Sequence, residues 1–276
     1  MGHKATIGDG EMKKIGFIGC GNMAKAMIGG IVASGLVPAQ EVLASARTEA
    51  TRTAAEKAYG ICTTADNREV AQNCEVVVLA VKPQVYLEVI AEIASAVDEH
   101  TVLVTIAPGF TLARLEELFG HSVKLVRTMP NTPAMVREGM TAACKNTAVT
   151  EQEMESVLAI LSSFGKAKLI PEGLMDAVVA VSGSSPAYVY LFIEAMADAA
   201  VLQGMPRPMA YEFAAQSVYG AAKMVLETGK HPGELKDMVC SPKGTTIEAV
   251  RVLEEKGLRS SVIEAMIACG EKAKKV

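Results

Sequence analysis

The segment IGFIGCGNMAKAM, residues 15 to 27, holds the residues of this chain whose types and spacing best suit ligand binding. An apolar stretch runs directly into Gly19, Gly21 and Ala24, in the spacing G-x-G-x-x-A. In such a segment the first glycine permits a tight turn, the second lets the backbone approach a pyrophosphate, and the small third residue lets a helix pack closely on a strand. The N-terminus of that helix favours an anion. The segment therefore predicts a dinucleotide-binding turn; the alternative is a strand-to-helix turn with a structural role only.

A cation follows the second predicted strand, at the position that distinguishes the two nicotinamide dinucleotides. Strand 41–45 ends at Ser45 and is followed by Ala46, Arg47 and Thr48, none of them acidic. In a dinucleotide domain an acid at this point binds the adenosine ribose of NAD, whereas a cation accommodates the 2′-phosphate of NADP. A guanidinium with two hydroxyls beside it suits a phosphate. The segment predicts a preference for NADPH over NADH; the alternative is that Arg47 is an ordinary surface cation.

Two further segments bring polar residues to places where ligands bind. LAVKPQ, residues 79 to 84, leaves a buried strand at its C-terminal end, so we expect Lys82 in a cofactor-contacting loop rather than as an unrelated surface charge. SPKGTT, residues 241 to 246, comes directly before a helix that begins near Thr246. Unpaired backbone N–H groups and the positive end of the helix dipole coincide there. This arrangement suits a carboxylate; the alternative is an ordinary Ser/Thr cap.

Composition and the remaining polar residues argue against several other functions. The net charge is −4 and no block of Lys or Arg stands out beyond the short tail at 272–275, so nucleic-acid binding is not expected. The six cysteines include no C-x-x-C pair and no zinc-type cluster with the four histidines, so we expect reduced thiols and no metal. His231, before Pro232, is predicted to begin a helix rather than to act in catalysis.

No apolar run approaches the roughly 18 residues of a membrane span, and the start lacks a signal peptide. A soluble, cytoplasmic protein without a membrane partner is expected.

Strand and helix patterns alternate in the first half of the chain. The run VVVLAV at 76–81 is continuously apolar, as expected of a strand buried on both faces of a parallel sheet. Alternation of this kind predicts right-handed crossovers and an α/β, Rossmann-like, doubly wound sheet. Further strands are predicted at 41–45, 61–63 and 101–107, with weaker candidates at 123–127 and 140–145.

From Thr150 onward the strand patterns give way to amphipathic helices, which predicts an all-α C-terminal domain. Thr150 followed by Glu153 is typical of a capping box. Predicted helices cover about 150–163, 173–181, 186–203, 207–228, 233–239, 245–255 and 260–273. We therefore predict a disordered leader or expression remnant at 1–11, a dinucleotide-binding domain at 12–165, and a helical dimerisation and substrate domain at 166–276.

The helix at 186–203 is apolar on much of its circumference, which is more than one small helical domain needs to bury. A large exposed apolar face is unusual in a soluble monomer. The pattern predicts that two copies of the chain pair through this helix.

Five motifs follow one another along residues 12 to about 270: the glycine-rich turn, AVKPQ at 80–84, MPNTP at 129–133, SGSSPAY at 182–188 and LKDMVCSPKGTTIEAV at 235–250. In this order and spacing the chain resembles the pyrroline-5-carboxylate reductase family. The last motif is close to diagnostic of that family, whereas the glycine-rich turn alone would fit many.

The resemblance implies an enzyme with a small-molecule substrate. Members reduce the cyclic imine Δ1-pyrroline-5-carboxylate to L-proline by hydride transfer from NADPH or NADH, the last step of proline biosynthesis. Their helical domains interlock as dimers, often assembled into decamers. The resemblance leaves open the choice between NADPH and NADH and between a dimer and a decamer.

Carried over position by position, the resemblance also implies a set of site residues. It places Thr246 in the substrate site, and because Thr246 stands at a helix N-terminus we expect its hydroxyl to hold the imine nitrogen. Either this hydroxyl or a water would donate the proton. Substrate contacts are implied at Glu172, Ser241, Gly244, Thr245 and Thr246. Cofactor contacts are implied at Gly19, Cys20, Gly21, Asn22, Met23, Ala46, Arg47, Asn67, Ala80, Val81, Lys82 and Ala107.

Two other classes of protein compete with this interpretation. A β-hydroxyacid-type dehydrogenase also joins a Rossmann domain to a helical one, but it needs a catalytic Lys in a glycine-rich helix of the helical half, and no such motif is present. A non-enzymatic scaffold that senses pyridine nucleotides would need no substrate loop, so the segment 241–246 argues against it.

Overall fold

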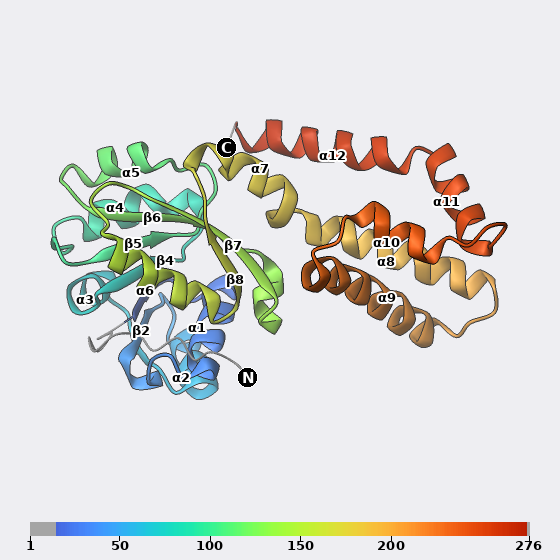
Figure 1. Ribbon diagram of the computed structural model, residues 1–276. Coiled ribbons are helices and arrows are strands. Elements are labelled where there is room, and N and C mark those ends of the chain that lie inside the picture. The colour runs from blue at the N-terminus through green and yellow to red at the C-terminus, as the bar shows by residue number, and fades with distance from the viewer. Residues whose placement is uncertain (1–14, 275–276) are drawn as a thin grey trace. The chain divides into compact units, whose positions relative to one another are not determined.

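The computed structural model describes residues 15–274, and the predicted leader at 1–11 lies outside this range. The chain divides into two compact units: one comprises residues up to Gly183 together with those from Gly270 onward, and the other comprises Ser184–Cys269. Figure 1 shows the strands in the first unit and helices alone in the second.

The first unit is built on one eight-stranded sheet in the order β3-β2-β1-β4-β5-β6-β7-β8. The six strands from β1 to β6 are parallel, β7 is antiparallel to β6, and β8 is parallel to β7. Strand order reverses between β1 and β4, which is the topological switch point where such sheets bind ligands. The strands are β1 Ile15–Ile18, β2 Val42–Ser45, β3 Cys62–Thr64, β4 Val76–Leu79, β5 Val102–Thr105, β6 Lys124–Met129, β7 Gly139–Lys145 and β8 Gly165–Leu169.

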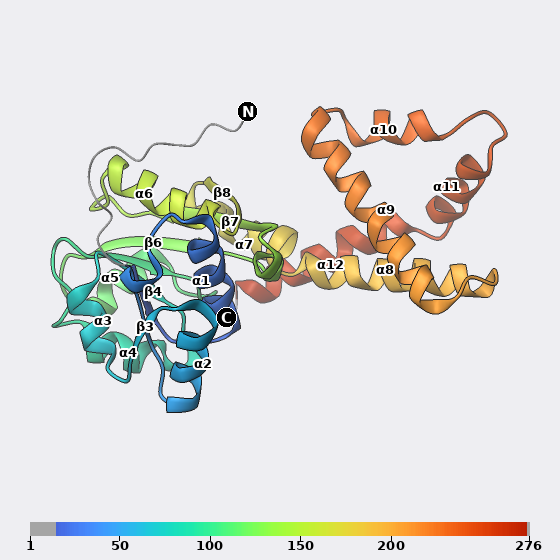
Figure 2. The same ribbon diagram turned by 90° about the horizontal axis from the view of Figure 1, so that it is seen from below.

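Helices cover both faces of this sheet (Figures 1 and 2). One face packs on α1 Asn22–Ser34, α2 Glu49–Tyr59 and α6 Glu151–Ser162. The other face packs on α3 Asn67–Asn73, α4 Tyr86–Ile93 and α5 Leu112–Phe119. The short helices of this unit are η1 Ala39–Glu41, η2 Pro83–Val85, η3 Thr132–Val136, η4 Glu172–Leu174, α7 Met175–Val178 and the π-helix η5 Val179–Gly183.

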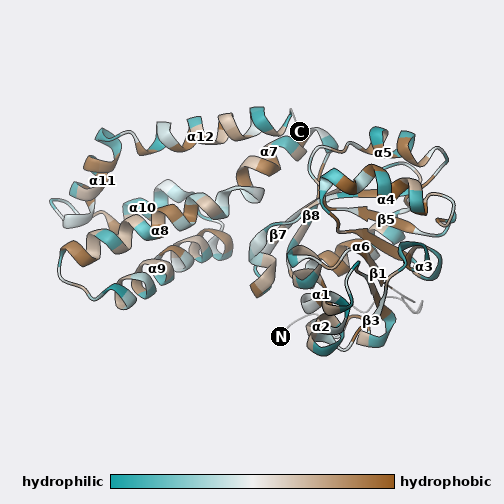
Figure 3. Ribbon diagram, turned by 180° about the vertical axis from the view of Figure 1, so that it is seen from behind, coloured by the Kyte–Doolittle hydropathy of each residue, from teal (hydrophilic) through white to brown (hydrophobic). Residues whose placement is uncertain are grey.

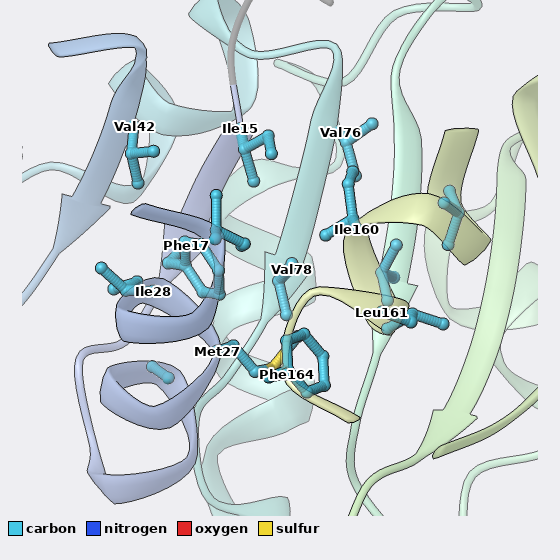
Figure 4. Close-up of a cluster of buried hydrophobic side chains, with 14 of the residues drawn as sticks. Ile15, Phe17, Met27, Ile28, Val42, Val76, Val78, Ile160, Leu161 and Phe164 are labelled. Atoms are coloured by element: carbon cyan, nitrogen blue, oxygen red, sulfur yellow. The ribbon is translucent and has the colours of Figure 1, made fainter. Parts of the chain in front are cut away.

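The core of the first face explains why the strands are so apolar. Phe17 of β1 and Val78 of β4 point from the sheet toward α1, and Phe164, which follows α6, closes the same layer (Figure 4). Phe17 and Phe164 are both fully buried. Strands covered on both faces in this way are expected to be continuously apolar. The predicted α/β doubly wound architecture is confirmed.

Two features of the first unit differ from the sequence-based prediction. Strand β8 is absent from that prediction, because GKAKL is short, its residues Lys166, Lys168 and Leu169 are exposed, and it lies at the edge of the sheet, where it pairs with β7. The predicted domain boundary between 165 and 166 also lies earlier than the division in the structure, since the first unit continues through β8 and the short helices to Gly183. The capping box at Thr150 and Glu153 is confirmed.

The second unit consists of helices, as predicted. They are α8 Ser185–Leu202, α9 Arg207–Thr228, α10 Pro232–Val239, α11 Thr245–Glu255 and α12 Leu258–Ala273, the last of which ends among the residues assigned to the first unit. Helices α8 and α9 pack against each other. His231 is the N-cap of α10 and accepts a hydrogen bond from the Gly233 N–H, so its predicted role as a helix-start residue is confirmed.

The helices of the second unit leave most of their large apolar side chains exposed. On α8, Tyr190 and Leu191 are 60% and 70% exposed, and Phe213 on α9 is 60% exposed. Figure 3 shows hydrophobic stretches along α8, α9 and α11. By length and composition alone, the helical run 172–202 could also cross a membrane, but one such helix is weak evidence for a span. Apolar side chains exposed to this extent are typical of a surface that binds another protein chain.

Candidate active site

The residues predicted to bind the cofactor gather at one edge of the sheet. Segment 19–23 follows β1, Ala46 and Arg47 follow β2, segment 80–82 follows β4, and Ala107 follows β5. Asn67 is the first residue of α3, just after β3. These are the carboxyl ends of parallel strands on both sides of the switch point, so the fold brings all the predicted cofactor positions to the edge where a dinucleotide binds.

The glycine-rich turn has the conformation that a pyrophosphate site requires. Gly19 has a φ of 97°, and a Cβ at this residue would lie 2.9 Å from the main-chain oxygen of Ala80. Gly21 is the N-cap of α1, has no side chain with which to cap it, and has open space where a Cβ would stand. The first N–H groups of α1 therefore remain available to an anion. The Cys20 side chain is buried, and this burial raises the pKa of its thiol, so Cys20 offers its backbone rather than a thiolate.

At the adenosine end, Arg47 is an exposed cation and its expected hydroxyl partners are engaged elsewhere. The Thr48 hydroxyl caps α2 by accepting from the Thr51 N–H. The Ser45 hydroxyl is buried and donates to Asn67. The Ser45 proton is therefore used within the protein, whereas the contribution of the exposed Thr48 hydroxyl to a phosphate site beside Arg47 stays a prediction. Arg52, which sequence analysis missed, donates from Nη1 to the Ala46 carbonyl at 2.8 Å and to the Arg47 carbonyl at 3.4 Å, and so fixes the loop that carries Arg47.

Asn67 is held from two sides. Its Oδ1 lies 2.7 Å from Ser45 Oγ, and its Nδ2 donates to Glu92 Oε2 on α4 at 2.7 Å. Ser45 Oγ also accepts from the Gly19 N–H at 3.3 Å. The sequence carries no signal for Glu92, because an acid on a helix surface is usually solvated and only the fold places this one beside α3.

Beyond the switch point, a buried tyrosine supports the loops expected near the nicotinamide. Tyr86 donates from its hydroxyl to the Leu79 carbonyl at 2.6 Å, and its ring stacks on Phe110 with 4.8 Å between centroids. Burial strongly raises the pKa of the Tyr86 hydroxyl, although backbone groups of Ile106 and Ala107 partly oppose this shift. Ala107 is itself buried, so it can contact a ligand only through its backbone or over a small area. A Tyr directly after AVKPQV was the available signal, since a buried Tyr hydroxyl needs a partner.

Glu172 lies in the first unit with its carboxylate already engaged. Glu172 Oε1 accepts from the Leu112 N–H, at the start of α5, at 2.8 Å and from Arg127 Nη1 at 2.9 Å. Arg127 is nearly buried on β6. Through these two hydrogen bonds Glu172 ties η4, α5 and β6 together, while a third of its side chain remains exposed. Within the described residues, its contacts are structural.

The segment 241–246 belongs to the second unit and forms a tight turn before α11. The Gly244 N–H donates to the Ser241 carbonyl at 3.0 Å, and Lys243 adopts the left-handed region with a φ of 59°. A Cβ at Gly244 would lie 2.4 Å from Ser241 Oγ, which explains the glycine.

Helix α11 presents free donors at its start. It begins at Thr245 with Gly244 as its N-cap and without a side-chain cap. Thr246 is half-buried, and among residues 15–274 its hydroxyl has no hydrogen-bond partner. Free N–H groups, a favourable dipole and an unengaged hydroxyl thus meet at one helix end, as a carboxylate-bearing ligand requires. Elsewhere in residues 15–274, no three His, Cys, Asp or Glu side chains lie close enough together to hold a metal ion.

A doubly wound sheet with an uncapped, glycine-flanked helix at its switch point, joined to a helical unit with exposed apolar helices, defines a two-domain dinucleotide-dependent oxidoreductase. Residues 172–276 match the family model for pyrroline-5-carboxylate reductase dimerisation, and residues 14–109 match that for NADP oxidoreductase, coenzyme F420-dependent. The chain is 54% identical over 264 residues to the pyrroline-5-carboxylate reductase of Escherichia coli strain K12, which covers 96% of this chain and 98% of that protein.

Solved structures agree with these matches. The pyrroline-5-carboxylate reductase of Coxiella burnetii has a TM-score of 0.90 and 34% identity, covering 96% of this chain and 98% of that one. The pyrroline carboxylate reductase of Plasmodium falciparum, solved with NADP bound, has a TM-score of 0.86 and 32% identity, covering 95% and 97%. The chain belongs to the pyrroline-5-carboxylate reductase family and is an NAD(P)H-dependent oxidoreductase.

Proposed function

We propose that this chain catalyses the reaction for which its family is named, the reduction of Δ1-pyrroline-5-carboxylate to L-proline as the last step of proline biosynthesis. The observation that carries the proposal is the uncapped start of α11, where backbone N–H groups and, within the described residues, the Thr246 hydroxyl are unengaged. A cyclic imino acid offers this site a carboxylate and a ring nitrogen, which are the two groups it can bind. NAD(P)H supplies the hydride when bound.

The first unit supplies the proposed cofactor site. The free N–H groups of Asn22 and Met23 face the pyrophosphate, and Arg47 binds the 2′-phosphate of NADPH, which makes NADPH the preferred cofactor. Lys82 and Ala107 lie toward the nicotinamide. This assignment is supported by the position of these residues at the carboxyl edge of β1, β2, β4 and β5.

The segment 241–246 supplies the proposed substrate site. The N–H groups at the start of α11 and the Ser241 hydroxyl hold the carboxylate, and Gly244 and Thr245 shape the turn. The Thr246 hydroxyl holds the imine nitrogen, so that either this hydroxyl or a water it positions delivers the proton. A positioned proton donor of this kind contributes about 10²- to 10⁴-fold to a rate. We include Glu172 as the residue that positions the start of α5 rather than as a direct ligand, because its Oε1 atom already accepts from the Leu112 N–H and from Arg127.

The working form is a soluble, cytoplasmic homo-oligomer built from dimers, with the decamer as its larger assembly. The dimer is supported by the exposed apolar side chains of α8 and α9. Pairing would also account for the apolar run 172–202 without a membrane.

The test is an assay of NADPH oxidation by the purified protein, with formation of L-proline followed by chromatography. We expect turnover with Δ1-pyrroline-5-carboxylate and none with a panel of 3-hydroxy acids and NADP⁺. Turnover of the hydroxy acids alone would instead identify a β-hydroxyacid dehydrogenase. Binding of NADPH without any turnover would identify a nucleotide-sensing scaffold.

A further inference from the structure

The hydrogen-bonded chain Gly19–Ser45–Asn67–Glu92 joins four elements beneath the proposed cofactor site. Gly19 follows β1, Ser45 ends β2, Asn67 begins α3, and Glu92 lies on α4. The three links are the Gly19 N–H to Ser45 Oγ at 3.3 Å, Ser45 Oγ to Asn67 Oδ1 at 2.7 Å, and Asn67 Nδ2 to Glu92 Oε2 at 2.7 Å. Ser45 is buried, whereas Asn67 and Glu92 are half-buried.

The carboxylate at the end of this chain sets the direction of every hydrogen bond in it. An ionised carboxylate can only accept, so the Asn67 atom that faces Glu92 must be Nδ2. This leaves Oδ1 facing Ser45, whose hydroxyl must then donate to it. A hydroxyl that donates in this direction keeps its lone pairs for the Gly19 N–H. One charge on α4 thereby fixes the orientation of the Asn67 amide and of the Ser45 hydroxyl, which accepts from the N–H of Gly19 in the glycine-rich turn.

The Asn67 amide, once oriented in this way, can still form hydrogen bonds to a ligand. Asn67 Nδ2 carries a second N–H, and Oδ1 has a second lone pair, so the residue offers one donor and one acceptor side by side. The adenosine half of a dinucleotide carries matching pairs on its purine edge and its ribose hydroxyls. A freely rotating amide would present these groups in either order, whereas a fixed amide presents only one.

We propose that Glu92 and Ser45 are positioning residues, which hold the Asn67 amide in the one orientation that binds the adenosine half of the cofactor. The proposal rests on the proposed function only in assigning Asn67 to the cofactor site. The neighbouring Arg68 donates from Nε to the main-chain oxygen of Glu92 at 2.9 Å, so this N–H does not engage the carboxylate.

The test compares Glu92→Ala with Glu88→Ala, since Glu88 is an exposed acid on the same helix. Dissociation constants for NADPH and for 2′,5′-ADP are measured by titration calorimetry. We expect Glu92→Ala to raise both constants about 3- to 10-fold, the range of one ordinary hydrogen bond, and Glu88→Ala to leave them unchanged. Glu92→Gln, which keeps an acceptor but no longer fixes the amide, should fall between. The kcat at saturating NADPH and the KM for the imine should not change.

A double variant tests whether the residues act through one amide. Ser45→Ala alone should weaken binding by a similar factor, but Ser45→Ala with Glu92→Ala should weaken it by less than the product of the two single effects. Independent, multiplicative effects would overturn the proposal, as would equal losses in Glu92→Ala and Glu88→Ala.

Asn67→Ala separates this proposal from the assignments on which it rests. If Asn67→Ala weakens 2′,5′-ADP binding and Glu92→Ala does not, the positioning role is wrong while Asn67 remains a cofactor ligand. If neither variant weakens binding, Asn67 is not a ligand and the proposal falls with it. Failure of the wild-type protein to reduce the imine would overturn the proposed function without affecting these binding results.

Discussion

Single residues of the two proposed ligand sites differ in whether their polar groups are already engaged within the protein. Thr48, Ser45 and Glu172 lie where a ligand could be expected, yet each is engaged with the protein. Arg47 is exposed, and no described contact engages the Thr246 hydroxyl. Because a group that is satisfied in the folded protein gains little from a ligand, Arg47 and Thr246 are the residues whose replacement should affect the reaction most.

Replacing Arg47 with Ala should selectively weaken the use of NADPH. A charge-assisted hydrogen bond contributes about 1.5 to 3 kcal/mol, so kcat/KM for NADPH should fall on the order of 10- to 100-fold. The value for NADH should hardly change, because NADH lacks the 2′-phosphate. Steady-state kinetics with both cofactors measure the ratio. Equal losses with the two cofactors would show that Arg47 does not contact the phosphate.

Replacing Thr246 separates its hydroxyl from its shape. Thr246→Val removes only the hydroxyl and should lower kcat/KM for the imine by roughly 10²-fold or more, the range of a positioned acid-base group. Thr246→Ser keeps the hydroxyl and should lose much less, and neither variant should change the affinity for NADPH. A Thr246→Val variant with wild-type kinetics would assign Thr246 to helix capping and the proton to solvent.

The buried thiols should resist alkylation at neutral pH. Burial raises the pKa of the Cys144 thiol to about 11, and the charge of Glu172 acts in the same direction. Since the thiolate is the reactive form, Cys144 should remain unlabelled by iodoacetamide at about pH 8, whereas the exposed Cys62 should react. Mass spectrometry of the digested protein compares the two sites. Rapid labelling of Cys144 in the folded protein would contradict its enclosure.

At the level of elements, the sequence predicts those whose pattern is local. Three of these are recognisable within a few residues and form as expected: the apolar run of β4, the capping box of α6 and the glycine-rich turn. Strand β8 and the π-helix η5 have no local pattern that predicts them. Strand β8 is defined by its pairing with β7, and η5 by a hydrogen-bond shift within a continuous helix. The contacts that support the site, such as Tyr86 with Leu79, join residues by tertiary packing and leave no spacing signal.

Helix α6 should lose the ion pair between Glu153 and Lys124 of β6 as the pH falls. Burial of the Glu153 carboxylate raises its pKa, but hydrogen bonds from Lys124 and Thr150 outweigh this effect and leave the pKa below its usual value. A carboxyl with a depressed pKa stabilises the fold fully above the unfolded-state pKa of about 4.3, and this contribution is lost as the pH falls through the folded-state value.

Glu153→Gln tests this ion pair against Glu155→Gln, which replaces an exposed acid on the same helix. Glutamine can still complete the capping box but cannot pair with the charge of Lys124. At about pH 7 the first change should therefore lower the free energy of unfolding by about 0.5 to 1 kcal/mol, the upper range of a partly exposed ion pair, and the second should not. Between about pH 5 and 3 the stability of the Glu153→Gln variant should fall less steeply than that of the wild type. Urea denaturation at neutral pH and at about pH 4 measures both effects; parallel pH profiles would contradict the role of Glu153.

For the whole molecule, the exposed apolar side chains of the second unit should make the stability of the fold depend on association of two chains. Leu191 on α8 is 70% exposed in one chain, and Leu87 on α4 of the first unit is 54% exposed. If pairing of two chains covers α8, Leu191→Asp should shift the protein to monomers in sedimentation and lower its thermal stability, because binding stabilises only the folded state. Leu87→Asp should do neither.

Dilution of the wild-type protein should have the same effect. As the concentration falls below the dimer dissociation constant, activity and the stability of the helical unit should decline together. A protein that sediments as a monomer at the assay concentration and remains fully active would contradict the need for pairing.

The tight turn at Ser241 and Gly244 constrains how this sequence can diverge. A side chain at residue 244 would lie 2.4 Å from the Ser241 hydroxyl and 3.1 Å from its carbonyl oxygen. The hydroxyl can rotate away, but the carbonyl is fixed by its hydrogen bond from the Gly244 N–H. Alanine at 244 would therefore turn the Ser241 hydroxyl away and press on the Ser241 carbonyl. Because that hydroxyl is proposed to hold the substrate carboxylate, glycine should persist at 244 in descendants of this chain for as long as they bind the same substrate.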